Sequence, residues 1–449
     1  MPPLDPANLI FPSAHHSISS TLTTLSRSHL TVSNRLRSIK HDAEFVEAVS
    51  SIYQLPLIAN ERCGSWYITP ELKAGSAYFK STDGHFGQWG FSLRRLNLGV
   101  LEVVGRQGGC IIVDSTRRGK SMPDALSKTV PIWVAVLNRL LFPDERDSHV
   151  VKTPQDVVSR SEHAQIEQRL PNFVSELRNL ALDIDGLRSK LYGRPMEVTW
   201  ATPDSPLSSP PQSLSGRNLV VLCTASGRTM AGKPADFDYV QGAADDHESW
   251  AHGLTPQLFW SNNGLLSSAS EEELPLVIQN LVSKGKTQST SRKPVVIKPT
   301  SNIFISDNAA AREMHRDFGI AVSCSEKPDA LLSEHLGEKY IHLCCTTGKV
   351  GSRQLRSVLP RLSLVAASLS YDTRVLITCQ TGRDLAVGVA LALICLRCGN
   401  DGEIAPSPHA PRPLNKTLIK QRLSWIMVSM PDAVPSRATL QSVNAFLLG

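Results

Sequence analysis

The sequence predicts an α/β protein. Short apolar runs, such as Cys110–Val113, Leu219–Cys223 and Arg374–Thr378, alternate with longer segments of helical spacing. Strands that alternate with helices are typical of a parallel or mixed sheet covered by helices. At 449 residues the chain is long enough for two or three domains. We expect an α+β N-terminal part with a mixed sheet and a C-terminal α/β domain.

The composition is that of a globular protein, because 41% of the residues are hydrophobic and 20% are charged. No run approaches the roughly 20 apolar residues of a membrane-spanning helix, so we expect no membrane association. The nine cysteines are an odd number, which favours reduced thiols in the cytoplasm, with the nucleus as an alternative. The net charge of +6 permits a polyanionic partner, and nothing indicates an obligate protein partner.

The first half of the chain predicts helices on either side of a strand-rich segment. A first helix is expected from Ser33 to Tyr53, because apolar residues recur there near helical spacing. A later helix is expected from Asp124 to Leu141, with a possible kink at Pro131. Between them, glycine-containing turns separate short apolar runs. We expect strands at Trp66–Ile68, Ala77–Phe79, Phe91–Leu93 and Leu101–Val104.

Polar stretches divide the chain. Residues 1–30 form a flexible tail in this interpretation, and residues 31–325 form the first domain. Within it, proline- and serine-rich or polar linkers lie near 203–217 and 284–300. Residues 326–449 repeat the alternation of strand and helix and form the second domain.

The loop from Asp114 to Ser121, which reads DSTRRGKS, carries the most chemical information. A strand that leads into a helix through such a loop directs backbone N–H groups and the positive helix end at one point, which suits a phosphate. Asp114 can bind a metal or a sugar hydroxyl. Part of the loop resembles the strand–acid–Ser/Thr–Gly loop with which many phosphoribosyltransferases bind ribose 5-phosphate. A basic surface turn is the alternative. The candidate phosphate-binding residues are Ser115, Thr116, Arg117, Arg118, Gly119, Lys120 and Ser121.

Two further segments concentrate polar side chains. Tyr78–His85 places Lys80, Asp83 and His85 around a turn glycine, although a hairpin tip would use Asp83-Gly84 for its backbone shape alone. In Asp236–Trp250, neighbouring carboxylates attract Mg²⁺ and raise one another's pKa, as metal-assisted or general-base chemistry requires. The alternative is a helix N-terminus with acids that complement its dipole. The candidates in this segment are Gln241, Asp245, Asp246, His247 and Glu248.

The segment Val375–Asp384 resembles the phosphate loop of dual-specificity protein phosphatases, in which a strand, a cysteine, a loop and a helix surround an anion. It departs from their CxxxxxR pattern, because Leu385 stands where the arginine belongs and Thr378 replaces the preceding histidine. Thiolate activation therefore lacks its usual support, but the loop can still bind a phosphate. The candidates are Cys379, Thr381, Gly382, Arg383 and Asp384.

Taken together and in this order, the motifs resemble one family, the initiator-tRNA 2′-O-ribosyl-phosphate transferases of fungi and plants. The resemblance covers nearly the whole chain except the tail and the two linkers. It is carried by NRLRSI (Asn34–Ile39), ANERCGSWY (Ala59–Tyr67), YFKSTDGH (Tyr78–His85), FSLRRLNL (Phe91–Leu98), VDSTRRGKSMPDALSKTVPIW (Val113–Trp133), YVQGAADDHESWAHGLTP (Tyr239–Pro256) and TGRD (Thr381–Asp384).

The resemblance implies that the first domain is a transferase domain and the second is like a dual-specificity phosphatase. It also implies transfer of phosphoribosyl from phosphoribosyl pyrophosphate, with Mg²⁺, to a T-stem adenosine of initiator methionine tRNA. Catalysis would then fall to acids among Asp83, Asp114, Asp245 and Asp246, and the metal to Asp245, Asp246 and Glu248. Donor phosphates would bind on Lys80, on the 115–121 loop, on the 379–384 loop or between them.

An RNA substrate would explain the cations near the first loop, because an A-form stem is recognised mainly through its shape, phosphates and 2′-hydroxyls. We expect Arg94, Arg95 and Arg106 to contact the tRNA, and a solvated charged face is the alternative. Two other functions stay open: a phosphatase or phosphatase-derived module acting on RNA or protein, which depends on Cys379, and a P-loop kinase or nucleotidase, which depends on Arg117–Ser121.

Overall fold

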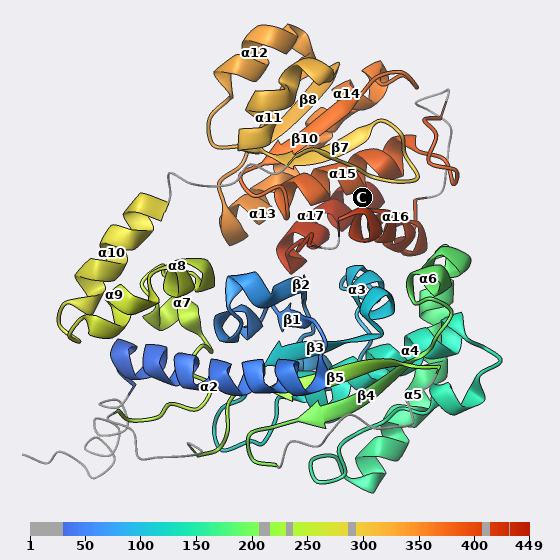
Figure 1. Ribbon diagram of the computed structural model, residues 1–449. Coiled ribbons are helices and arrows are strands. Elements are labelled where there is room, and N and C mark those ends of the chain that lie inside the picture. Colours follow the sequence, from blue (N-terminus) through green and yellow to red (C-terminus); the bar gives the residue numbers. More distant parts are fainter. Residues whose placement is uncertain (1–29, 206–215, 230–236, 286–292, 406–413, 431) are drawn as a thin grey trace, which may run out of the picture.

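The computed structural model describes residues 30–205, 216–229, 237–285, 293–405, 414–430 and 432–449. Two β-sheets, each covered by helices, lie one above the other (Figure 1), and the expected α/β class is confirmed. The tail expected at residues 1–30 lies outside the described residues except for Leu30, as do 206–215 and 286–292 of the two linkers. No helix in the described part is long and apolar enough to cross a membrane.

The first sheet has five strands in the order β2-β1-β3-β5-β4, and all of them are parallel. A mixed sheet was expected here; instead, helical crossovers connect strands that run the same way. The strands are β1 (Leu57–Asn60), β2 (Lys73–Ala77), β3 (Gly109–Asp114), β4 (Met196–Ala201) and β5 (Asn218–Thr224).

Helices cover both faces of this sheet, and the strands alternate between the two cores. Ile58, Ile112 and Val220 face one core, while Ala59, Ile111 and Val221 face the other, as the two-residue period of a strand requires. The first core contains α3 (Gly99–Gln107), α4 (Val130–Leu141), α5 (Arg160–Arg178) and α6 (Ile184–Lys190). The second contains α2 (Val32–Tyr53), α8 (Pro256–Ser261), α9 (Asn263–Ser268) and α10 (Leu274–Gly285), with the single turn α7 (His247–Trp250).

Two helix predictions are confirmed. The helix expected from Ser33 is α2, in which the Thr31 hydroxyl caps the N–H of Asn34 at 3.1 Å. The helix expected from Asp124 to Leu141 begins as a π-helical stretch, Ala125–Thr129, and continues as α4.

The short strands expected between Trp66 and Val104 were mostly wrong. Trp66 lies in a 3₁₀ helix, Gly64–Tyr67, and Phe91–Leu93 is irregular. Only Ala77 of the second run belongs to a strand, β2. Leu101–Val104 lies in α3, because Val100, Leu101 and Val104 are buried on one side at helical spacing and Gly108 ends the helix with a φ of 74°.

The second sheet has the order β6-β7-β10-β8-β9, and only β6 is antiparallel to its neighbour. Its strands are β6 (Val295–Val296), β7 (Ile303–Asp307), β8 (Ile320–Ser325), β9 (Tyr340–Cys344) and β10 (Val375–Cys379). The smaller core, on one face, lies under α11 (Asn308–Met314) and α12 (Ala330–Leu336). The larger core involves α13 (Gly348–Val358), α14 (Leu362–Ser368), α15 (Leu385–Arg397), α16 (Lys416–Ser429) and α17 (Arg437–Leu448).

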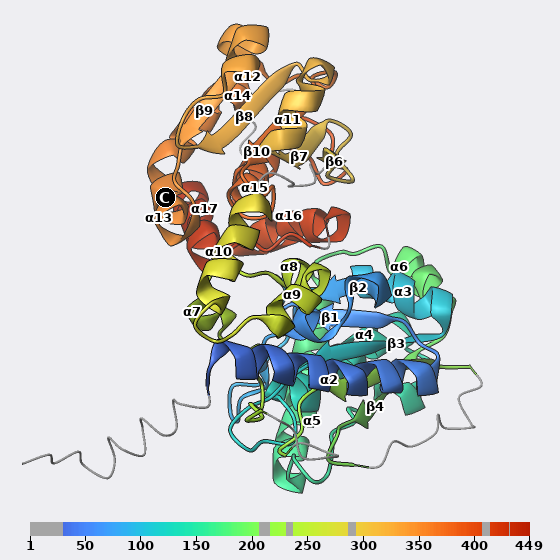
Figure 2. The same cartoon turned by 60° about the vertical axis from the view of Figure 1, so that its left-hand side comes forward.

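The domain boundary expected between residues 325 and 326 divides this second sheet, because β7 and β8 both pair with β10. The change from one sheet to the other lies between α10, which packs on the first core, and β6. In both views α16 and α17 are on the side of the second domain that faces the first (Figures 1 and 2). There the Gln421 amide donates to the Asn179 carbonyl at 2.7 Å.

Candidate active site

Polar side chains meet where the central strands of the first sheet end. Strands β1 and β3 are parallel neighbours and end at Asn60 and Asp114, so their carboxyl ends lie side by side. The Asn60 amide donates to Asp114 Oδ2 at 2.8 Å. The loops that follow β1, β3 and β5 therefore converge on one edge of the sheet, which is where open α/β sheets bind their ligands.

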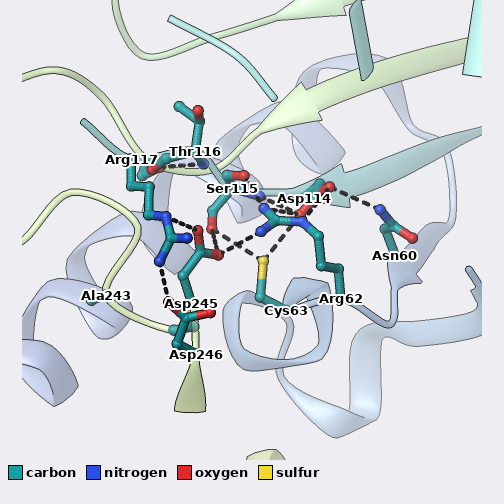
Figure 3. Close-up of polar contacts among 12 residues, drawn as sticks. Asn60, Arg62, Cys63, Asp114, Ser115, Thr116, Arg117, Ala243, Asp245 and Asp246 are labelled. Atoms are coloured by element: carbon teal, nitrogen blue, oxygen red, sulfur yellow. Dashed lines mark hydrogen bonds and ion pairs between the residues drawn. The ribbon is translucent and has the colours of Figure 1, made fainter. Parts of the chain in front are cut away.

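Asp114 is fully buried at this edge (Figure 3). Its carboxylate accepts hydrogen bonds from the Cys63 thiol at 3.0 Å and from the N–H of Ser115 at 2.8 Å. Arg62 Nη2 donates to Asp114 Oδ1 at 2.9 Å. A carboxylate with this many donors is held in one orientation, so Asp114 organises the loop rather than facing open solvent.

Arg62, which the sequence-based prediction missed, joins this strand end to a second acid. Its Nη1 donates to Asp245 Oδ1 at 2.9 Å, while its Nη2 donates to Asp114 and to the Ser115 carbonyl (Figure 3). Burial alone would lower the pKa of Arg62. The surrounding Cys63, Asp114 and Asp245 raise it by more than burial lowers it, so the pKa lies above its usual value. The guanidinium is therefore permanently charged at this position.

The cationic loop after β3 is tied to the acidic segment after β5. Arg117 pairs with Asp246 through Nη1, and its Nε lies 3.7 Å from Asp245 Oδ2. The Gln241 side chain accepts from the N–H of Gly119 at 2.7 Å and donates to the Lys120 carbonyl at 2.9 Å. These contacts hold the two segments together.

Gly242 permits their close approach. Its φ is 65°, and a Cβ there would lie 2.4 Å from the Thr116 carbonyl oxygen. Only glycine fits such a position without displacing a backbone. Arg118 also has a positive φ, 61°, and strain of this kind at a non-glycine residue is common at functional sites.

A pocket of about 250 Å³ opens over this network. Four basic side chains line it, from Arg62, Arg117, Arg118 and Lys120, against two carboxylates, from Asp124 and Asp245. Pro123 and Asp124 also line it, directly before the helix that begins at Ala125, so the positive end of that helix points toward the pocket. This excess of positive charge suits an anionic ligand that carries more than one phosphate.

Other predicted residues complete the wall. Ser115, Thr116 and His85 line the same pocket, together with Ser81, which was not predicted, and His85 Nε2 lies 3.5 Å from Asp124 Oδ2. Asp83 does not belong to the lining, and burial raises its pKa although Lys80, Arg95 and Arg94 lower it. Ser121 instead lines a neighbouring pocket of about 520 Å³ beside Trp200.

The acids expected to hold a metal are not gathered into one site. Asp245 is buried and faces the pocket, whereas the Asp246 side chain is 67% exposed and paired with Arg117. Glu248 is exposed on α7, and the His247 ring packs 5.7 Å from the Trp66 ring. Among the described residues, no group of three or more His, Cys, Asp or Glu side chains is placed to hold a metal ion.

The candidate tRNA-binding arginines are separated by the fold. Arg95 stacks over the Tyr78 ring at 4.0 Å. Burial raises the pKa of Asp83, and both Lys80 and Arg94 lower it. Arg106 lies on α3 and pairs with Glu102 at 2.6 Å, both of them exposed. Arg94, Arg95 and Lys80 thus lie near the 78–85 segment, and Arg106 belongs to another surface.

The loop after β10 lies in the second domain and lines a separate pocket of about 580 Å³. Cys379 is buried there, with the thiols of Cys324 and Cys345 in the same lining. The described residues that line it include the acids Glu326 and Asp384 but neither lysine nor arginine. An anion would find no permanent cation in this pocket.

The fold and this site define an α/β protein with a pocket lined by several cations at the strand ends of its first domain. Residues 25–283 match the Rit1 N-terminal domain and residues 339–447 match the Rit1 DUSP-like domain. The chain belongs to the Rit1 family.

Two curated proteins are similar to the chain over almost their whole length. An uncharacterised protein of Schizosaccharomyces pombe is 36% identical over 92% of this chain and 94% of that protein. The tRNA A64-2′-O-ribosylphosphate transferase of Saccharomyces cerevisiae is 32% identical over 96% of this chain and 95% of that protein. Among solved structures, that of human DUSP28 is similar over 36% of this chain and 97% of the DUSP28 chain, with 13% sequence identity and a TM-score of 0.26.

Proposed function

We propose that the protein transfers a 5-phosphoribosyl group from phosphoribosyl pyrophosphate to the 2′-hydroxyl of a T-stem adenosine in initiator methionine tRNA. Membership of the Rit1 family supports a transferase that modifies tRNA, since the S. cerevisiae relative carries that activity in its name. The structural observation that carries the proposal is the pocket in which four cations and the Asp245 carboxylate meet. The proposed tRNA substrate is consistent with a location of the protein in the cytoplasm or the nucleus.

The reaction makes two demands on the protein. The bond between the ribose anomeric carbon and the pyrophosphate oxygen breaks, and a bond from that carbon to the 2′-oxygen forms. Negative charge grows on the departing pyrophosphate, and the 2′-hydroxyl loses a proton. In this proposal Arg117, Arg118 and Lys120, which line the pocket, stabilise the pyrophosphate, because fixed charges in a partly enclosed pocket are worth more than charges in water.

Asp245 is our candidate for the base that takes the proton. It is the carboxylate of the 245–246 pair that lines the pocket, and the Trp250 indole N–H donates to its backbone carbonyl at 3.1 Å. Arg62 and Arg117 hold its side chain from two sides. Asp124, which pairs with Lys120 and Lys128 at 3.5 Å and 3.1 Å, is the other acid in the lining.

A dedicated protein site for Mg²⁺ does not fit these residues, because the pocket carboxylates are already paired with arginine or lysine. Mg²⁺ commonly binds through substrate phosphates with one or two carboxylates and several waters. We therefore propose that the ion accompanies the donor, and we derive no step of the reaction through it.

The test is incubation of the purified protein with a donor labelled in its ribose, in the presence of initiator or elongator methionine tRNA. Label should appear in the initiator alone, within the T-stem, and pyrophosphate should be released in equal amount. No label in either tRNA would overturn the proposed activity. Equal label in both would overturn the proposed specificity.

A phosphatase is the alternative function, and the loop after β10 gives it little support. Arg383 does not line the pocket of Cys379. Asp384 accepts from the Thr439 hydroxyl at 2.5 Å and from the N–H of Ser436 at 2.8 Å, so it is committed to the start of α17. The geometry thus provides a thiol without the guanidinium that would hold a phosphate beside it.

A further inference from the structure

Arg383 points out of the phosphatase-like loop toward the first domain. It lines a pocket of about 270 Å³ between the two domains, together with Lys73 and Arg95 from the first. Its Nη2 pairs with Asp432 Oδ2 at 3.1 Å, and its side chain is still 54% exposed. The cation of this loop therefore serves a surface that the two domains share.

The junction pocket is polar and carries an excess of cations. Lys73, Arg95 and Arg383 face two carboxylates, those of Glu61 and Asp432. Lys73 Nζ is 2.6 Å from Glu61 Oε1, so its charge is largely balanced. Arg383 is likewise paired, with Asp432, but keeps about half of its side chain exposed, so the junction pocket has an excess of one cation over its carboxylates.

Arg95 has unused hydrogen-bonding capacity at this place. Its guanidinium lies 4.0 Å over the Tyr78 ring. Its Nη1 is buried and has no hydrogen-bond partner among the described residues. This nitrogen is closed to solvent, so an anion in the junction pocket can reach only other atoms of Arg95, which lines the pocket.

The junction pocket lies close to the active site. Tyr78 lines the junction pocket and Ser81 lines the active-site pocket, and three residues of chain span at most about 11 Å. Burial raises the pKa of Asp83, and the nearby cations Lys80, Arg95 and Arg94 lower it. These cations therefore lie near the segment that joins the two pockets.

We propose that Arg383 and Arg95 bind backbone phosphates of the RNA substrate at the domain junction, while the stem presents its 2′-hydroxyl to the active site. This rests on the proposed function for the identity of the RNA. Arg383 does not line the pocket with the cationic loop, so the extended RNA backbone suits it better than the compact donor. Proteins recognise an A-form stem chiefly through its phosphates and 2′-hydroxyls. The second domain thus acts as an RNA-binding element.

The test measures binding of initiator tRNA to the full chain over a range of salt concentrations. Arg383→Ala should weaken binding by about fivefold to tenfold and reduce the slope of log Kd against log salt by about 1, as the loss of one phosphate contact does. Asp432→Asn removes the competing carboxylate and should strengthen tRNA binding. The KM for the donor should stay unchanged in both variants. Arg356→Ala, an exposed arginine on α13, is the matched control and should leave binding unchanged.

Opposite effects of the two variants separate this role from a structural one. An ion pair that only stabilises the second domain, to which both residues belong, would lower the thermal stability of both variants and leave tRNA binding unchanged. That result would overturn the inference, as would a raised donor KM in Arg383→Ala. Arg383→Lys keeps the charge and is used if the alanine variant unfolds; it should preserve the salt slope. If the wild-type protein binds tRNA and Arg383→Ala weakens that binding, but no product forms, the proposed function is contradicted and this inference still stands.

Discussion

Asp114 and Asp245, which lie more than a hundred residues apart in the chain, accept hydrogen bonds from the same guanidinium, each at 2.9 Å from Arg62. One of these acids ends a central strand and the other lines the pocket. The shared arginine fixes the distance between them through charge-assisted hydrogen bonds. The ends of two separate chain segments thus form one rigid unit.

Asp245→Asn should lower the single-turnover rate at least about 100-fold, which is the low end of what a general base contributes. The amide cannot accept the proton, but it keeps the size of the side chain, so tRNA affinity should be nearly unchanged. Asp246→Asn should have a much smaller effect, because this side chain is 67% exposed and contacts the pocket only through Arg117. Glu248→Gln serves as control. Parental turnover in Asp245→Asn would assign the base to Asp124 or Asp83.

Arg117→Ala and Lys120→Ala should weaken binding of the donor, because both side chains face the pocket and act on phosphate charge. We expect an increase of about tenfold or more in the donor KM, with tRNA binding less affected. Isothermal titration with donor alone provides the check. The Lys40→Ala variant, which removes an exposed cation from α2, is the control. Unchanged donor binding in both pocket variants would remove the cationic loop from the donor site.

Cys379→Ser should retain most of the transferase activity. The thiol is buried in a pocket lined by Glu326 and Asp384, and Arg383 faces elsewhere. Activation of a thiol as a nucleophile requires a nearby cation or base. The measurement is product formation beside a thermal melt. A folded but inactive serine variant would contradict this account.

Removal of divalent metal with EDTA should abolish product formation but leave the melting temperature unchanged. The expected metal accompanies the donor, and the described residues offer no group of three ligands that would stabilise the folded chain through a metal. Added Mg²⁺ should restore activity. Full activity in EDTA would exclude the metal, and a lower melting temperature would reveal a structural ion.

Asp42→Asn should raise thermal stability at neutral pH. Burial raises the pKa of Asp42 well above its usual value, although the hydrogen bond from the Tyr239 hydroxyl at 2.8 Å opposes this. The folded state therefore binds a proton that the unfolded state has lost above about pH 4. Stability is lost as the pH rises from there toward the raised pKa. Melting curves from pH 4 to pH 8 should show a gap between variant and parent that grows with pH. A difference between variant and parent that stays constant with pH would contradict the raised pKa of Asp42.

The sequence predicts the acids and cations of the candidate site better than their arrangement. Asp114 and Asp245 could be chosen because each stands in a polar segment at the end of an apolar run. Arg62 was missed because its importance depends on β1 and β3 being neighbours, which no local pattern reveals. The quoted motif Ala59–Tyr67, which contains Arg62 directly after a buried strand, was the available signal.

The fold was predicted where a segment is long or strongly apolar. β3, β5 and β10 match the expected strands closely. The failures lie between Trp66 and Val104, where runs of three or four apolar residues are too short to separate a two-residue period from a helical one. The boundary at residue 325 was wrong for another reason: strand order is set by tertiary pairing, and sequence neighbours β7 and β8 are not neighbours in the sheet.

That strand order has a consequence for how the protein is made. β10 lies between β7 and β8, so these two strands have nothing to join them until residues 375–379 have left the ribosome. The first sheet needs no strand beyond Thr224 and can form early in synthesis. The emerging chain thus passes through a stage in which a finished first domain is followed by two strand pairs of the second, β6-β7 and β8-β9, that β10 has not yet joined. This nascent intermediate is the stage at which a chaperone would be most useful.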